Sequence, residues 1–559
     1  MQRLLATKAH ALGAGLLLLA APVLANPASD APDDAGFEQR CAALAAQAGP
    51  TLVIDDARYL AAGELPQASA SSAALTGAAL SKAAMPAQCL VTGTLQPRQG
   101  VGGDYGIGFE LRMPLEWNGN FLYQGGGGLN GIVSQAIGAV PVSGSTSLPA
   151  LSRGFAVIST DSGHQGESNA DASFGVDQQA RLDFGYAAIG KVHDLALELI
   201  DAFYAKAPSH SYFMGCSNGG REAMMAAQRF PLNFDGIVAG NPGFRMSHAA
   251  IGEAWSTRQL SQIAPRDGDG QPILSAALTS KDMSLIGDKV LAQCDAADGL
   301  EDGQIDAMKA CSFDPATLAC PAEKHDGCLS QAQVGALKEV FDGAHDSSGG
   351  QLYASWPWDA GLAGDNWRSW VLGTSTTAEP DALNAVIGTS SLAHYFITPP
   401  QPDLKLSSLD FDTIAEQVAQ TAAINDATST QYASFEHRGG KLLVFHGNSD
   451  PVFSANDLRS YWDGLVQDNG GRDPVAEWAR LFIVPGMTHC GGGPALDDFD
   501  PLAAIQAWVE QDQAPAHLIA QGASFPGRSR PICPYPEEAR FTGTGDPQDA
   551  ANFACRLPD

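Results

Sequence analysis

The chain opens, after its N-terminal segment, with an alternation of short apolar runs and amphipathic stretches. The amphipathic stretches that suit helices are Ala187–Tyr204 and Gly220–Phe230. The β-rich runs, each ending in a Gly-rich or polar loop, are Asn118–Gln124, Phe155–Thr160, Ser211–Gly215 and Phe234–Ala239. Such alternation predicts an α/β fold with a parallel sheet covered by helices on both faces.

The pattern changes between about Met246 and His437, where polar helical pieces with five Trp and four closely spaced Cys replace the strands. Strand-like runs return at Lys441–Phe445 and Leu481–Val484. A chain of 559 residues is also too long for one hydrophobic core. We therefore expect a lid domain over residues 246–437, inserted into a catalytic core made of residues 26–245 and 438–559. Loops at the carboxyl ends of parallel strands are where such folds bind ligands.

The first 25 residues are typical of a cleavable export signal. Arg3 and Lys8 precede the apolar run Ala11–Ala21, and Val23-Leu24-Ala25 offers the small residues of a cleavage site. The run is shorter than the ~20 residues that span a bilayer, although an N-terminal anchor is the alternative. All ten Cys follow this segment, an even number that suits disulfides in an oxidising compartment. We expect a secreted or periplasmic protein.

The composition is that of a globular protein with a strongly acidic surface. The formal net charge of −30 disfavours partners such as nucleic acid and anionic membranes. An anionic substrate would need a cation inside its pocket. No pair of CxxC motifs with zinc-site spacing occurs in the sequence. We expect a monomer with no organic cofactor, whose partner is a small-molecule substrate.

A nucleophile is predicted at Ser217, the centre of the G-x-S-x-G motif in Gly215-Cys-Ser-Asn-Gly219. The motif follows a predicted strand and opens a predicted helix, which is the context of the nucleophile in α/β-hydrolases. Small neighbours permit the sharp turn, and the helix N-terminus favours developing negative charge. The expected architecture is thus an α/β-hydrolase core with a large inserted lid domain.

The acid and the base follow from chain order, because this fold places Ser first, then Asp or Glu, then His. Asp450 follows the run at 441–445, and His489 follows the run at 481–484. His517, the other histidine beyond Asp450, lies in a segment that suits a surface or packing role. The alternatives are a simple turn-former before Pro451 for Asp450 and a loop histidine without a task for His489.

Backbone donors for an oxyanion are expected in two places. The glycine run at 125–128, after a predicted strand, offers Gly128, and the main chain of Asn218 offers the second donor. A flexible turn is the alternative for the glycines.

These motifs resemble the tannase and feruloyl esterase family. The resemblance rests on Gly215-Cys-Ser-Asn-Gly-Gly-Arg221 together with Val484-Pro-Gly-Met-Thr-His-Cys490. It covers nearly the whole chain after the leader and is closest to the branch that hydrolyses mono(2-hydroxyethyl) terephthalate. It implies five disulfides, namely Cys41–Cys89, Cys216–Cys490, Cys294–Cys311, Cys320–Cys328 and Cys533–Cys555.

The resemblance also implies a structural Ca²⁺ in the lid, in the acidic loop that runs from Cys294 to Asp306. Hard oxygen ligands along a Gly-containing loop suit this ion, and an acidic solvated turn is the alternative. The implied ligands are the carboxylates of Asp295, Asp298 and Asp302 with the carbonyls of Leu300 and Gln304.

Substrate contacts are implied by resemblance at His446, Phe453, Trp358, Gly127 and Arg368. Arg368 could hold a substrate carboxylate through a bidentate pair, or could instead pack against its Trp neighbours to support the lid. The chain departs from the terephthalate branch at two positions beside the expected oxyanion hole: Asn218 replaces Glu, and Gly127 replaces Ser.

The sequence therefore predicts a secreted serine esterase that acts on small aromatic monoesters, such as mono(2-hydroxyethyl) terephthalate, which it would cleave to terephthalate and ethylene glycol. The alternative substrates are plant phenolic esters, as for a feruloyl esterase or tannase. A catalytically silent aromatic-binding protein is the alternative from another class, and the presence of all three triad residues disfavours it.

Overall fold

The computed structural model describes residues 34–63 and 84–558. The predicted export signal, residues 1–25, lies outside these ranges. Within them, no helix combines the length and the apolar character needed to cross a membrane.

A nine-stranded mixed sheet forms the centre of the molecule, with the order β1-β2-β3-β5-β4-β6-β7-β8-β9. Its strands are β1 (Leu52–Leu60), β2 (Gln88–Gly100), β3 (Gly103–Pro114), β4 (Asn120–Gln124), β5 (Ala156–Thr160), β6 (His210–Cys216), β7 (Gly236–Gly240), β8 (Lys441–Gly447) and β9 (Ala479–Val484).

The six strands from β5 to β9 in this order are mutually parallel, as the sequence predicted. The first three strands are antiparallel and precede residue 118, where the sequence predicted no strand. Edge strand β1 shows why: it has no fully buried position, so its sequence carries no core-like apolar run.

Side chains along each central strand alternate between two cores, one on each face of the sheet. In β6, Phe213 joins one core, whereas Tyr212 and Met214 join the other. In β8, Val444 joins the first core, whereas Phe445 joins the second. This two-residue period is the geometry of a strand that is buried on both faces.

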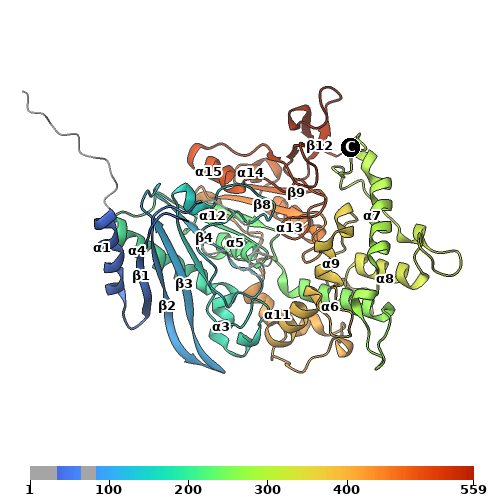
Figure 1. Ribbon diagram of the computed structural model, residues 1–559, viewed down its shortest axis with the longest axis horizontal. Coiled ribbons are helices and arrows are strands. Elements are labelled where there is room, and N and C mark those ends of the chain that lie inside the picture. The colour runs from blue at the N-terminus through green and yellow to red at the C-terminus, as the bar shows by residue number, and fades with distance from the viewer. Residues whose placement is uncertain (1–33, 64–83, 559) are drawn as a thin grey trace, which may run out of the picture.

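Helices cover both faces and also build the region between β7 and β8 (Figure 1). Those outside this region are α1 (Asp34–Ala43), α3 (Gln178–Leu182), α4 (Ala188–Tyr204), α5 (Asn218–Arg229), α13 (Ala455–Asp468), α14 (Arg472–Ala476) and α15 (Pro501–Gln511). Those between β7 and β8 are α6 (Met246–Ile263), α7 (Ser280–Cys294), α8 (Gln331–Asp342), α9 (Asp365–Val371), α10 (Leu383–Ser391), α11 (Ile414–Asn425) and α12 (Ala433–His437).

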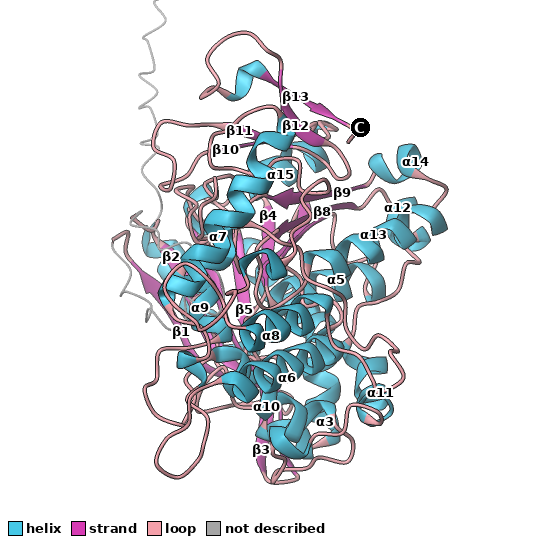
Figure 2. Ribbon diagram, turned by 90° about the vertical axis from the view of Figure 1, so that its right-hand side faces the viewer, coloured by secondary structure: helices cyan, strands magenta, loops and turns pink. Residues whose placement is uncertain are grey.

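The predicted lid, residues 246–437, falls in this second group, and Figure 2 shows a cluster of its helices around α6, α8 and α10, with α12 beside α13 instead. Residues 241–440 are all described and contain no strand of the sheet. Most of them surround a further hydrophobic cluster that includes Trp255, Trp367 and Trp370, whereas Tyr432 and Phe435 pack in a core of the sheet. Val452 and Phe453, from the loop after β8, belong to the same cluster, so the lid packs directly on a loop of the core.

The chain ends in two small antiparallel hairpins made of β10 (Leu518–Ala520) with β11 (Arg530–Ile532) and β12 (Glu538–Phe541) with β13 (Phe553–Arg556). All ten Cys are paired, and the five predicted disulfides are confirmed.

Candidate active site

Ser217 stands on a sharp turn between β6 and α5. Its backbone has φ 62° and ψ −125°, a left-handed conformation that is strained for a residue with a side chain. The flanking glycines make the turn possible, because a Cβ on Gly215 would lie 2.7 Å from the backbone of Gly219. The turn presents the Ser217 hydroxyl at the end of the strand, ahead of the helix N-terminus.

Ser217, His489 and Asp450 form a continuous hydrogen-bonded chain. His489 Nε2 lies 2.9 Å from Ser217 Oγ. His489 Nδ1 lies 3.0 Å from one carboxylate oxygen of Asp450 and 3.1 Å from the other. The three loops that carry these residues follow β6, β8 and β9. The sequence predicted all three, and parallel strands bring their carboxyl ends to one edge of the sheet.

The surroundings of Asp450 keep it ionised. Burial by itself would raise the pKa of this carboxyl, but His489, with smaller contributions from His446 and Asn241, lowers it below the ordinary value. Asn241 Nδ2 donates to Asp450 Oδ2 at 2.7 Å, and the backbone N–H of Val452 donates to Oδ1 at 2.8 Å. The carboxylate is therefore fixed to orient His489 and to stabilise its charged form.

The disulfide Cys216–Cys490 ties the nucleophile turn to the histidine loop. Each Cys is adjacent in sequence to a triad residue, and the bond joins positions 274 residues apart. Cys490 has a positive φ of 56°, so the chain turns sharply just after His489. The bond fixes Ser217 and His489 relative to each other across this distance in sequence.

Gly128 lies beside Ser217, at the end of the glycine run. It adopts φ 55°, and a Cβ here would lie 2.4 Å from the carbonyl oxygen of Asn169, so only glycine fits. Gly128 and Asn218 line the same pocket as Ser217. Their backbone N–H groups are the expected oxyanion donors on either side of the nucleophile.

Glu222, on α5, joins the glycine run to the nucleophile helix. Its carboxylate accepts hydrogen bonds from the Gly126 N–H at 2.9 Å, Asn130 Nδ2 at 2.8 Å, Ser162 Oγ at 3.0 Å and Asn218 Nδ2 at 3.1 Å. The side chain is 2% exposed. Glu222 is thus a positioning residue for both candidate oxyanion donors, and no motif in the sequence singles it out.

Replacing Glu222 by Gln is expected to lower kcat about 100-fold with a much smaller change in KM. The Gln amide would place N–H groups against the groups that donate to Glu222, which displaces the glycine run at 125–128. A shift of catalytic groups by about 1 Å can lower the rate about 100-fold. Steady-state kinetics on a chromogenic ester would measure the effect. Glu198→Gln, at an exposed position on α4, is the control; an equal loss in both variants, or a loss confined to KM, would contradict the positioning role.

A pocket of about 470 Å³ opens beside Ser217 between the core and the lid. Its walls are mostly apolar. The lining residues are Gly128, Leu129, Ser217, Asn218, Met246, Ala250, Glu253, Trp370, Ile387, Ser391, Phe396, Val452 and Phe453. Trp370 and Phe453 meet the His489 ring edge-on, with centroid distances of 5.0 and 5.5 Å. The pocket thus offers aromatic walls next to the reacting groups.

Of the predicted substrate contacts, Phe453 lines this pocket and Arg368 does not. The Arg368 guanidinium donates to two lid carbonyls, those of Leu278 at 3.0 Å and Ser275 at 2.6 Å. Both terminal nitrogens therefore hold lid backbone, which favours the alternative that the sequence left open. The carboxylate contact expected for Arg368 has no support in this geometry.

His446, Trp358 and Gly127 are also absent from the pocket lining. His446 is fully buried behind the triad, where its Nε2 lies 2.9 Å from the carbonyl oxygen of Phe453 and 3.6 Å from Asp450 Oδ2. Burial lowers its pKa, so its imidazole is neutral. Trp358 stacks on Phe341 at a centroid distance of 3.6 Å within the lid. The Gly127 carbonyl accepts from the backbone N–H of Asn130 at 3.0 Å.

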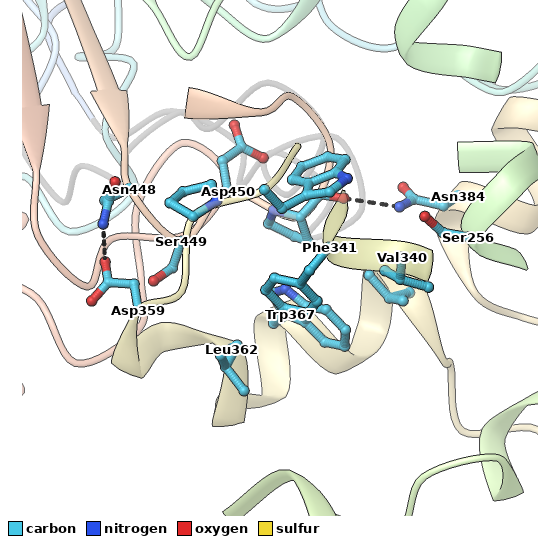
Figure 3. A pocket seen from close by; sticks show the side chains of 14 residues that line it. Ser256, Val340, Phe341, Asp359, Leu362, Trp367, Asn384, Asn448, Ser449 and Asp450 are labelled. Atoms are coloured by element: carbon cyan, nitrogen blue, oxygen red, sulfur yellow. Dashed lines mark hydrogen bonds between the residues drawn. The ribbon is translucent and has the colours of Figure 1, made fainter. Parts of the chain in front are cut away.

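A second cavity of about 420 Å³, drawn in Figure 3, reaches Asp450 from the lid side and does not include Ser217. Asp359, on its wall, is 1% exposed and joins three segments. It accepts from Asn448 Nδ2 at 2.9 Å and from the N–H groups of Gly486 and Ala360 at 2.8 Å each. Asp359 thereby ties the lid to the loop after β8, which carries Asp450, and to the loop after β9, which carries His489.

The predicted calcium loop presents acidic oxygens close together. Burial raises the pKa of Asp298 to about 6, and the neighbouring Asp302 and Asp295 add to this rise. Gln304 Oε1 is buried without a hydrogen-bond partner. Asp302 also forms an ion pair with Arg530. Across the described residues, no three His, Cys, Asp or Glu side chains already stand in a metal-binding arrangement, although the donor chemistry suits a hard cation.

Several pocket residues had no individual signal in the sequence. Met246, Ala250 and Glu253 are spaced so that they share one face of a helix. This spacing predicts a buried helix face, but it does not predict which part of the protein the face contacts. Ile387 and Ser391 reach the pocket from α10, and Phe396 from the segment that follows it. Their convergence with Ser217 depends on how the lid folds back.

The chain is similar in sequence to known proteins over most of its length. The family described as tannase and feruloyl esterase matches residues 89–556. A mono(2-hydroxyethyl) terephthalate hydrolase from Piscinibacter sakaiensis is 42% identical over 529 residues, covering 86% of this chain and 87% of the relative. A probable feruloyl esterase from Arthroderma benhamiae is 27% identical over 84% of this chain and 85% of its own length.

Among solved structures, feruloyl esterase B from Aspergillus oryzae superposes with a TM-score of 0.76 at 24% identity, covering 93% of this chain and all of that one. A tannin acyl hydrolase from Aspergillus niger gives 0.67 at 23% identity over 91% of this chain and 92% of that one. These likenesses confirm the predicted α/β-hydrolase fold. With the triad residues of an ester hydrolase together at one site and a family match that spans most of its length, the chain belongs to the tannase and feruloyl esterase family of carboxylic ester hydrolases.

Proposed function

We propose that this protein is an exported serine esterase that hydrolyses small aromatic esters through a covalent acyl-enzyme. The observation that carries the proposal is the hydrogen-bonded chain from Ser217 Oγ through His489 to Asp450, which opens onto a pocket with aromatic walls. The five disulfides support the oxidising compartment.

In the first step, Ser217 Oγ attacks the ester carbonyl while His489 Nε2 accepts the hydroxyl proton. The Asp450 carboxylate stabilises the imidazolium that results. The oxyanion of the tetrahedral intermediate accepts hydrogen bonds from the backbone N–H groups of Asn218 and Gly128, each worth roughly 3–4 kcal/mol. His489 then gives its proton to the departing alcohol, and water releases the aromatic acid by the same path in reverse.

Two substrate classes remain as candidates. The relative from Piscinibacter sakaiensis, at 42% identity, favours a terephthalate half-ester. The pocket favours an uncharged aromatic ester, such as a phenolic ester, because none of its lining residues is Lys or Arg. A free carboxylate buried there would lose its hydration without gaining a counter-ion, at a cost of several kcal/mol.

Two measurements test the proposal. A fluorophosphonate probe followed by peptide mapping is expected to label Ser217, and a panel of aromatic esters with and without a free carboxylate is expected to give measurable kcat/KM values. Absence of labelling together with no turnover on the whole panel would leave only a binding role for the pocket. The ranking within the panel separates the two substrate classes.

We also propose that the loop from Asp295 to Gln304 holds a structural Ca²⁺, with the carboxylates of Asp295, Asp298 and Asp302 and the carbonyls of Leu300 and Gln304 as ligands. The crowded carboxyls support it, because a bound cation would relieve the repulsion among Asp295, Asp298 and Asp302. The ion would fix the loop that joins α7 to the C-terminal hairpins through Arg530.

Removing calcium is therefore expected to lower the Tm by several degrees. A ligand at 100 times its Kd stabilises the folded state by about 2.7 kcal/mol, and each kcal/mol shifts the Tm by about 2–4 °C or less in a large domain. Differential scanning calorimetry with EDTA, and with excess Ca²⁺ or Mg²⁺ added back, would measure it. Identical Tm values in all three conditions would contradict the site.

A further inference from the structure

The substrate pocket contains one buried carboxyl group that the proposed mechanism does not use. Glu253 lies on α6, one and two turns beyond Ala250 and Met246 on the same helix face, and all three line the pocket. Glu253 is 7% exposed. Ser391, Ser217 and Asn218 are the other polar residues of the lining.

The Glu253 carboxyl has no protein partner. Among the described residues, no side chain or backbone group forms a hydrogen bond or an ion pair with it, and Asp450 is the charged group whose field reaches it. Burial, with a smaller contribution from Asp450, raises its pKa well above the ordinary value, which favours the neutral acid. A neutral acid offers one O–H donor and free acceptor positions.

The neighbouring helix leaves space for this carboxyl. A Cβ on Gly388 of α10 would lie 2.6 Å from Glu253 Oε2, so a side chain there would displace the acid. Ser391, one turn further along α10, donates its hydroxyl to the Gly388 carbonyl at 2.9 Å and so does not donate to Glu253. An unpaired polar group in a buried wall costs stability. Such a cost is expected where the group serves binding.

We infer that Glu253 is the specificity-determining residue of the pocket, which hydrogen-bonds to an uncharged polar substituent on the aromatic ring of the substrate, a phenolic hydroxyl or an aryl ether oxygen. This inference rests on the proposed esterase function and deepens it. The same pocket disfavours a ring carboxylate, because the carboxylate would lose its hydration there with no Lys or Arg in the lining to replace it.

The test compares the kcat/KM ratio of hydroxy- or methoxy-substituted benzoate and cinnamate methyl esters to their unsubstituted parents. Glu253→Met, an apolar change of similar size, is expected to lower this ratio about 10- to 100-fold, as when a desolvated hydrogen bond is lost. Glu253→Gln is the matched variant. It keeps a donor and an acceptor, so it is expected to keep most of the ratio.

The Tm of the Met variant distinguishes a binding role of Glu253 from a structural role, because the two roles predict changes of opposite sign. Because Glu253→Met removes an unpaired buried polar group, it is expected to raise the Tm by about 2–4 °C. A structural Glu253 would instead lose stability on replacement. If the Met variant does not fold, the role of Glu253 is structural and the inference is overturned.

The remaining outcomes separate this inference from the proposed function. An unchanged ratio in the Met variant, or equal losses in the Met and Gln variants, would overturn the role of Glu253 while leaving the esterase intact. Faster wild-type turnover of monomethyl terephthalate than of dimethyl terephthalate would overturn the preference for uncharged rings. No turnover of any ester, with no labelling of Ser217, would instead refute the proposed function.

Discussion

Replacing Ser217 by Ala is expected to abolish ester hydrolysis, with a loss of kcat of about 10⁴- to 10⁶-fold, because the members of a catalytic triad act as a unit. Ser217 Oγ is the only atom removed, and its hydrogen bond to His489 is made at the surface of the pocket, so the fold should be retained. Kinetics on a chromogenic aromatic ester and thermal unfolding of the same preparation would check both statements.

A double variant tests whether Ser217 and His489 act together. A Ser217→Ala/His489→Ala double variant is expected to be no slower than either single variant, because each single change already removes the nucleophilic path. Ser209→Ala, at an exposed position just before β6, serves as the control and should retain full activity. Near-normal turnover by the Ser217 variant would refute the triad assignment.

Removing the disulfide Cys216–Cys490 by a double Ala substitution is expected to lower both stability and activity. It closes a segment of 274 residues, and the chain-entropy relation gives roughly 5.6 kcal/mol for a loop of this length. Both ends of the bond adjoin triad residues, so the Ser217–His489 geometry should loosen, and kcat should fall about 10- to 100-fold.

The disulfide Cys320–Cys328 is the matched control, because it closes only 8 residues within the lid. The same relation gives roughly 2.5 kcal/mol for this bond, and its removal is expected to leave kcat unchanged. Calorimetry and kinetics on both double variants would compare the effects. Equal losses of kcat in the two variants would show that the bond beside the triad has no special role in positioning it.

The triad was predictable from sequence because its signals are local and ordered. Ser217 sits in a five-residue motif, and Asp450 and His489 each follow an apolar run that reads as a strand. Parallel strands then place all three loops at one edge of the sheet. The disulfides depended on the family resemblance, because ten Cys alone leave the connectivity open.

The substrate pocket was less predictable, as Arg368 illustrates. Its sequence neighbourhood, Asn366-Trp-Arg-Ser-Trp370, suggests an aromatic-flanked cation for a substrate carboxylate. On α9, however, Trp370 faces the pocket while the Arg368 guanidinium reaches the carbonyls of Ser275 and Leu278. Residues two positions apart on a helix do not share a face, so one of the pair had to point elsewhere.

The sequence by itself determined the class of fold and the candidate nucleophile, acid and base, because periodicity and short motifs record which residues lie on which strand or turn. Only the tertiary structure decided which lid side chains meet Ser217. Glu253 and Ile387 lie 134 residues apart in the chain, yet they line one pocket. That meeting is set by the packing of α6 against α10, and no local pattern in the sequence encodes a contact between two distant helices.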